Sequence, residues 1–226
     1  MKKIVLCLLL LCGMFGAVFA QDGTAAGNQR NFFISLGFID RIMSENFPGG
    51  AFSFGYYTSE KSLFTAEINF GFYDAGQIGS YSYENKYWPY NRYDDGKITY
   101  NYTAIEFLAS WYYVGKISEK FQYRVGPSAG VLAITGSDSY EPTYNIENIP
   151  DPTTETKATV TAGAGAGFIW NFNKRWFLDF GYRIMVNPGI KFDERTLDIL
   201  GTNIKIKEKD FATLSNQFNL TAGFRF

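Results

Sequence analysis

The side chains that could do chemistry in this chain are carboxylates, arginines and serines, because the sequence contains no histidine. Histidine is the usual general acid or base near neutral pH, and a serine without a base partner is a weak nucleophile. Both cysteines, Cys7 and Cys12, lie within the first 20 residues. The sequence therefore predicts a protein that is not an enzyme, with a carboxylate-only mechanism as the alternative.

The same inventory argues against a metal centre or a cofactor. The usual zinc ligands, histidine and cysteine, are absent after residue 20. Asp94 and Asp95 could contribute to a calcium site, but Asp-Asp-Gly more often forms a turn. Glycine and alanine alternate at 162–167, yet their period is two and no helix follows, so this is no dinucleotide loop. We predict no metal and no cofactor.

The elements that position the remaining charges are segments in which apolar residues stand at every second position. A tilted strand needs about 9–11 residues to cross a bilayer, and we expect each segment to lie within a strand long enough to do so. The eight segments are 32–38, 52–56, 64–72, 103–113, 121–131, 160–170, 176–184 and 214–226. This periodicity predicts an all-β fold, an eight-stranded antiparallel up-and-down transmembrane β-barrel.

The connections between the segments alternate in length. Short turns are expected at 58–61, 114–120 and 172–175, and long polar connections at 74–98, 135–157 and 187–210. The connection at 40–50 is intermediate. Outer-membrane barrels have short periplasmic turns and long extracellular loops. Ile204 to Glu208 also alternates; we expect it to extend the last strand, with a ten-stranded barrel as the alternative.

The two ends of the chain are consistent with export to a membrane. Residues 1–20 have the basic start, apolar core and small cleavage residues of a signal peptide. We expect 21–30 to be a short periplasmic segment and 31–226 to be the barrel. Without Lys2 and Lys3, 19 basic residues remain against 22 acidic ones, which is too weak a charge for nucleic-acid binding.

The chain resembles the small outer-membrane β-barrel superfamily, which includes the OmpA membrane domain and the OmpX-like and OmpW-like proteins. The resemblance rests on the signal peptide, the eight segments, the terminal Phe226 and the segment 123–131. It implies an outer-membrane location in a diderm bacterium, with both termini in the periplasm. It also implies periplasmic chaperones and the barrel-assembly machinery as partners, which recognise the last strand through an expected assembly signal: Phe218, Leu220, Phe224 and Phe226.

The face opposite the apolar one carries balanced charges, expected in the lumen: Glu67, Glu106, Arg124, Asp179, Arg183 and Arg225. Buried charges are tolerated only when they are paired. Counting from the turns places Glu67, Glu106 and Arg183 in one network at mid-depth, and the other three near the periplasm. We predict a structural lumen charge network; the alternative is a gate that opens a narrow water path.

Strands 121–131 and 160–170 have mostly small residues inward, including a row of glycines at 163, 165 and 167. Arginine side chains could lie across this glycine floor, or water could fill it. The outward residues of these two strands are small as well, so we expect this part of the wall to contact either lipid or another protein within the membrane. Three tryptophans with outward parity near the short turns predict an aromatic girdle at the bilayer interface: Trp111, Trp170 and Trp176.

The connection at 74–98 is rich in aromatic residues among polar ones: Tyr81, Tyr83, Tyr87, Trp88, Tyr90 and Tyr93. Tyrosine-rich polar surfaces suit recognition, which favours contact with an extracellular ligand or host surface. Alternatively, these aromatics form an outer girdle and β-ribbon extensions. We therefore expect a structural and surface-interaction protein with a filled, salt-bridged lumen; the alternative is a narrow channel or transporter for small solutes.

Overall fold

The computed structural model describes residues 32–85, 92–141, 153–199 and 202–226. Within these ranges the side chains of 81–85, 92–95, 141, 197–199, 202 and 204 are not described. The expected signal peptide at 1–20 and the segment at 21–30 lie outside the described residues. No helix in the described part is long and apolar enough to span a bilayer.

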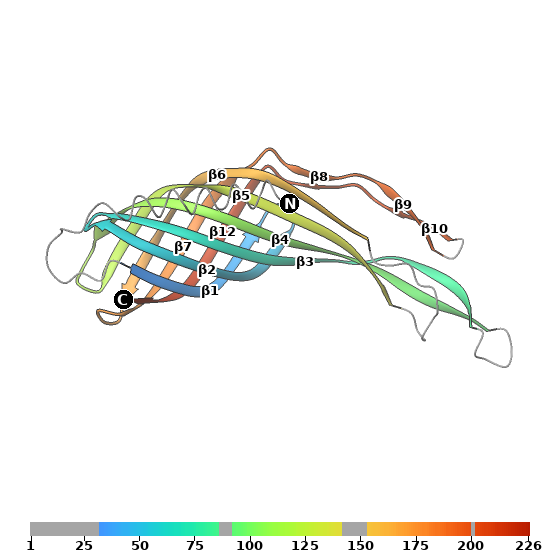
Figure 1. The fold of residues 1–226 in the computed structure, drawn as a ribbon, viewed down its shortest axis with the longest axis horizontal. Coiled ribbons are helices and arrows are strands. Elements are labelled where there is room, and N and C mark those ends of the chain that lie inside the picture. The colour runs from blue at the N-terminus through green and yellow to red at the C-terminus, as the bar shows by residue number, and fades with distance from the viewer. Residues whose placement is uncertain (1–31, 86–91, 142–152, 200–201) are drawn as a thin grey trace. The chain divides into compact units, whose positions relative to one another are not determined.

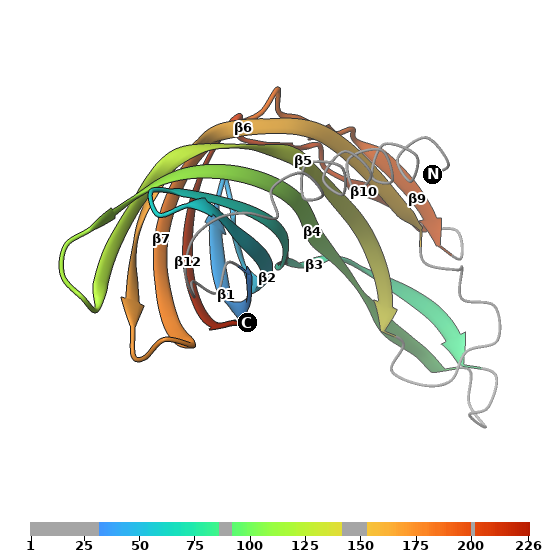
Figure 2. The same cartoon turned by 60° about the vertical axis from the view of Figure 1, so that its left-hand side comes forward.

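Eight long strands of the described chain close into a ring, which Figures 1 and 2 show from two sides. In chain order they are β1 (Phe32–Ile42), β2 (Asn46–Ser59), β3 (Ser62–Asn85), β4 (Arg92–Lys116), β5 (Phe121–Glu141), β6 (Thr154–Asn171), β7 (Trp176–Val186) and β12 (Leu214–Arg225). Each pairs antiparallel with its neighbours in the ring. The predicted eight-stranded antiparallel up-and-down barrel is confirmed.

The ring closes where the first strand meets the last. β1 and β12 pair continuously from Phe33↔Arg225 to Ile42↔Asn216, and the Phe226 backbone N–H donates to the Phe32 carbonyl at 3.0 Å. Backbone groups left unpaired in hydrocarbon are costly, so a membrane-spanning sheet must have no free edge. The last strand, whose apolar alternation continues to Phe226, therefore has a paired neighbour and leaves no free edge at this seam.

The alternation read from the sequence corresponds to two faces of the barrel wall. In β7, Phe180 and Ile184 are 45% and 44% exposed, whereas Asp179 and Arg183 are buried. The same alternation runs through the other barrel strands, so the outer face is apolar, whereas the inner face carries the buried charged and polar side chains together with buried apolar ones. Such an outer face is stable in lipid and not in water.

The turns at one end of the barrel agree with the prediction. They lie at 60–61, 117–120 and 172–175. At the other end the predicted boundaries are wrong. The connection expected at 40–50 is only 43–45, and most of 74–98 is strand, since β3 and β4 pair as far as Asn85↔Arg92. Above the membrane both faces of a strand can be polar, so the ladder continues where the hydropathy pattern has ended.

Strands β3 to β6 extend beyond the end of the barrel in Figure 2. The pairing of β2 with β3 begins at Gly49↔Gly71, so the rest of β3 pairs only with β4. The predicted loop at 135–157 is shortened in the same way, because β5 and β6 pair up to Ser137↔Thr154. The described backbone of this region thus forms a β-ribbon extension, which leaves the predicted recognition role of its aromatic residues a prediction.

The last outer connection folds into two small sheets. β8 (Ile190–Phe192) pairs with β11 (Lys209–Phe211), and β9 (Arg195–Ile199) pairs with β10 (Thr202–Ile206). The prediction that the segment at 204–206 extends the last barrel strand is therefore wrong. The alternative of a ten-stranded barrel is wrong as well. Its alternation marks a separate hairpin, whose partner lies a few residues upstream in the chain.

The depth of β6 in the membrane can be tested with one substitution at two positions. Ala164 is exposed on the outer face and lies between Pro127 and Ile184 on the neighbouring strands. Ala164→Arg should cost about 2–4 kcal/mol of folding free energy at mid-membrane, measured by urea titration in lipid vesicles. Ala158→Arg, on the same face beyond the pairing with β7, should cost no more than about 1 kcal/mol. Equal costs would contradict this placement.

Candidate functional site

Near the short turns, apolar side chains form a cluster inside the barrel. This periplasmic cluster is buried and comprises Phe33, Leu63, Tyr112, Val114, Ile169 and Phe177. The rings of Phe33 and Phe177 meet edge to face with centroids 5.0 Å apart. Arg225 lies against this cluster, with its guanidinium 4.6 Å from the Phe177 ring and Nη2 3.4 Å from the Tyr57 hydroxyl.

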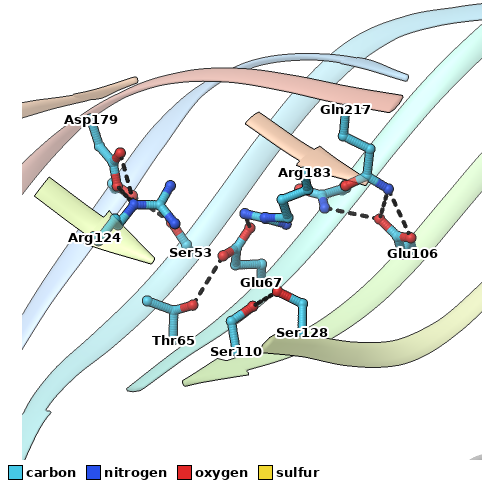
Figure 3. Close-up of polar contacts among 12 residues, drawn as sticks. Ser53, Thr65, Glu67, Glu106, Ser110, Arg124, Ser128, Asp179, Arg183 and Gln217 are labelled. Carbon is cyan, nitrogen blue, oxygen red and sulfur yellow. Dashed lines mark hydrogen bonds and ion pairs between the residues drawn. The ribbon is translucent and has the colours of Figure 1, made fainter. Parts of the chain in front are cut away.

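Figure 3 shows a layer of charged and polar side chains that are buried inside the barrel. Arg183 Nη2 donates to Glu67 Oε2, and Thr65 Oγ1 donates to Glu67 Oε1 at 3.0 Å. Both partners of the ion pair are buried, at 1% and 8% exposure. This geometry joins β3 to β7 across the lumen and satisfies both oxygens of the carboxylate.

Glu106 lies in a second cluster, although the sequence places it in one network with Arg183. Arg41 Nη2 donates to Glu106 Oε2, Asn69 Nδ2 donates to the same oxygen at 3.2 Å, and Gln217 Nε2 lies 3.1 Å from both oxygens. Arg41 was missed because its strand was expected to end at Phe38. Continuing the alternation of 32–38 by three residues would have placed it in the lumen.

The third ion pair lies on a floor of glycines. Arg124 Nε is 2.9 Å from Asp179 Oδ2 and 3.0 Å from Oδ1, and its guanidinium lies 4.3 Å from the centre of the Tyr112 ring. A Cβ at Gly181 would lie 2.5 Å from Arg124 Nη2, and one at Gly167 3.1 Å from Nε. The expectation that arginine crosses a glycine floor is confirmed, and Arg183 covers Gly165 in the same way.

The polar layer combines satisfied and unsatisfied groups. The Ser110 and Ser128 hydroxyls share a hydrogen bond of 2.7 Å across β4 and β5. Buried atoms without a protein partner include Arg183 Nε and Nη1 and Gln217 Oε1. Each of these can bind a water molecule, as buried polar atoms do in protein interiors. The layer therefore combines ion pairs with polar atoms that have no protein partner.

The outer mouth of the barrel contains a second apolar cluster, the outer cap, formed where β8, β10 and β11 pack against the inner faces of β2, β4 and β5. Its buried members are Phe47, Tyr100, Tyr102, Ala104, Leu132, Ile134, Ile190, Phe192, Ile206 and Phe211. The Tyr102 ring meets Phe211 at 5.0 Å and Phe192 at 5.3 Å. Apolar side chains from the last connection thus cover the polar layer on the outer side.

Polar contacts hold the rim of the outer cap. Lys209 Nζ pairs with Glu45 in the β1–β2 turn, and Lys157 Nζ donates to the Lys191 carbonyl. Burial raises the pKa of the Tyr100 phenol, which stays neutral and accepts a hydrogen bond from Arg195 Nη2 at 3.2 Å. The cap is therefore tied to the β1–β2 turn and to the extended strands β4 and β6.

The predicted girdle and assembly residues lie on the outer face. Trp111, Trp170 and Trp176 are exposed near the short turns, and each contacts a phenylalanine ring on a neighbouring strand. The residues of the expected assembly signal, Phe218, Leu220, Phe224 and Phe226, have the same outward parity in and just after β12. These positions do not by themselves assign a role in assembly.

Three of the six predicted recognition residues lie in the described part of the chain, and there only by their backbone. Tyr87, Trp88 and Tyr90 lie outside the described residues. The backbones of Tyr81, Tyr83 and Tyr93 belong to the paired extension of β3 and β4, and their side chains are not described. In the described part of the chain, no group of three or more acidic, histidine or cysteine side chains could hold a metal ion.

No family model and no curated protein matches the chain. Solved structures do match it. The attachment invasion locus protein Ail of Yersinia pestis, in complex with the heparin analogue sucrose octasulfate, is 13% identical with a TM-score of 0.50, covering 88% of this chain and 100% of that one. A major outer membrane protein from Thermus thermophilus is 11% identical with a TM-score of 0.51, covering 86% and 99%. At such identity the likeness concerns the fold.

The separation of the two glutamates can be tested through Arg183. Arg183→Ala should lower the free energy of unfolding by about 3–5 kcal/mol in urea titrations in vesicles, because Glu67 is left buried without a counter-charge. Adding Glu67→Gln should recover part of that loss. Adding Glu106→Gln instead should increase the loss, because Arg41 would then lose the carboxylate with which it pairs. Recovery by Glu106→Gln would mean that one shared network exists.

Proposed function

We propose that this chain, which has the fold of the small outer-membrane β-barrels and resides in the outer membrane of a diderm bacterium, is a closed barrel with a structural and surface-interaction role. In this proposal residues 1–20 are a signal peptide removed on export. Periplasmic chaperones and the barrel-assembly machinery deliver and insert the chain through its last strand. The proposal assigns no catalytic step.

The observation that supports the proposal is that two apolar clusters and a layer of ion pairs lie inside the barrel. The periplasmic cluster, the ion-pair layer and the outer cap follow one another along the barrel. An eight-stranded barrel is only wide enough for its side chains to fill. Because a path for a solute would have to cross two apolar layers and separate buried ion pairs, the arrangement favours a structural interior over a transport route.

The part of the molecule suited to interaction is the sheet that β3 to β6 carry beyond the membrane. Its rows are held by backbone pairs from Asp74↔Asn101 upward, so it is a rigid support for the aromatic residues between 81 and 93. Rigid tyrosines lose little conformational entropy on binding. We therefore place the recognition surface at the end of the β3–β4 extension.

A sulfated polyanion is not the ligand that the described charges favour, although the Ail structure contains one. Lysines around the outer cap are neutralised by neighbouring acids. The pairs are Lys157 with Glu155 and Asp193, Lys191 with Glu208, Lys205 with Glu194, and Lys209 with Glu45. Neutral aromatic recognition at the β3–β4 tip is therefore the form of interaction that we propose.

Closure of the lumen can be measured in planar bilayers. The refolded wild-type protein should give no steady current steps. The quadruple variant Tyr112→Ala, Glu67→Ala, Arg183→Ala, Tyr102→Ala should give measurable steps, because it removes large side chains from all three layers. Heat-modifiable migration in a gel serves as the folding control for both proteins. Steady steps from the wild type would contradict the proposal and favour the channel alternative.

The surface role can be tested by shortening the β3–β4 extension. Replacing residues 81–96 by a two-residue Asn-Gly turn joins Ser80 to Lys97, which are paired neighbours. The barrel should still fold and migrate as a heat-modifiable band, because the outer cap and the lumen are unchanged. Cells displaying this variant should lose binding to an array of matrix proteins and glycans that cells displaying the wild type retain. Equal binding by cells displaying the variant and by cells displaying the wild type would mean that the recognition surface lies elsewhere on the molecule.

A further inference from the structure

The outer wall of the barrel has a groove that the proposed function does not use. Its volume is about 710 Å³, and it crosses the outer faces of β5, β6, β7, β12 and β1. It begins at Ile117, in the turn between β4 and β5, and extends to Phe38 in β1. Except at Arg124, Asn219 and two glycines, apolar and aromatic side chains line the groove. Its occupant must therefore be apolar where it contacts the wall.

The register of the strands explains the groove. One outward row of side chains runs across five strands: Tyr123, Phe168, Phe180, Leu220 and Phe38. The next outward row consists of Val125, Ala166, Tyr182 and Phe218. The residues between the rows point inward, and Gly167 and Gly181 among them have no side chain. The floor is therefore backbone, supported from inside by Arg124.

The groove climbs from the periplasmic rim towards the middle of the membrane. It follows a row of residues that runs across the strands. Because barrel strands are tilted by about 35–45° from the barrel axis, such a row is itself inclined to the membrane plane. Four steps of about 4.8 Å between five strands give a length of about 19 Å. One leaflet of hydrocarbon is about 15 Å thick. The groove therefore has the length and inclination for a single acyl chain of the periplasmic leaflet.

Positive charge gathers at the low end of the groove. The turns 117–120 and 172–175 lie side by side, since the Asn171 N–H donates to the Lys120 carbonyl at 2.7 Å. In and next to these turns are four exposed cations and one acid: Lys116, Lys120, Lys174, Arg175 and Glu119. None of the four cations forms an ion pair with another described residue. An anionic headgroup at the membrane surface would neutralise them.

We propose that this groove is a binding site for an anionic phospholipid of the periplasmic leaflet. One acyl chain lies between the two outward rows, and the phosphate lies against the cations of the two turns. A second copy of the chain fits less well, because a symmetric contact through this face would bring two sets of unpaired cations together. The proposal concerns the lipid and is independent of the surface role.

The headgroup preference can be measured by tryptophan quenching. The protein is refolded in vesicles containing brominated phosphatidylglycerol or brominated phosphatidylcholine, since Trp170 and Trp176 lie beside the two turns. The wild type should prefer phosphatidylglycerol by about fivefold or more at low salt, the factor expected for a single basic residue near an anionic lipid. Replacing Lys116, Lys120, Lys174 and Arg175 by serine should reduce the ratio to about 1.

The groove itself is tested by filling it. In native mass spectrometry, the wild type should retain one phosphatidylglycerol, and the double variant Val125→Phe, Ala166→Phe should retain none. Ala162→Phe, on the same face of β6 but outside the groove, is the matched control and should behave like the wild type. Retention of lipid by the filled variant, an unchanged ratio in the serine variant, or a dimer in place of the lipid adduct would overturn the proposal.

Discussion

The structure depends on one constraint, the pairing of every backbone N–H and C=O group that lies in hydrocarbon. A sheet meets this constraint only by closing on itself, and the seam between β1 and β12 does so. Once the ring is closed, the pleat assigns alternate residues to lipid and to the lumen. The apolar outer face, the charged interior and the short turns are consequences of that closure.

The narrow interior then determines how charge is accommodated. Three arginines on β1, β5 and β7 each pair with one carboxylate, so the charges of these three pairs cancel. Long arginine side chains need space, and the glycines of β6 and β7 provide it. The apolar clusters on both sides of the layer reduce the contact of these pairs with bulk water, which strengthens their attraction.

The same glycines determine the shape of both faces of the barrel wall. Where Gly167 and Gly181 have no side chain, Arg124 lies against the wall within the lumen, and the backbone forms the floor of the outer groove. Substitution of either glycine would therefore disturb an ion pair and reshape a lipid-facing surface together.

The sequence alone determined the number, direction and faces of the barrel strands, because a period of two in apolar residues is a local property that the bilayer enforces. It also identified the buried charges of β3 to β7, whose parity follows from the same pattern. It did not determine which charges pair. Glu67 and Glu106 lie on neighbouring strands, yet Glu67 pairs with Arg183 on the strand opposite in the ring, whereas Glu106 pairs with Arg41 on β1. That choice depends on register and on barrel closure, which join residues far apart in the chain. The outer cap and the wall groove were likewise decided by tertiary structure, since each is built from several strands and no single segment contains its pattern.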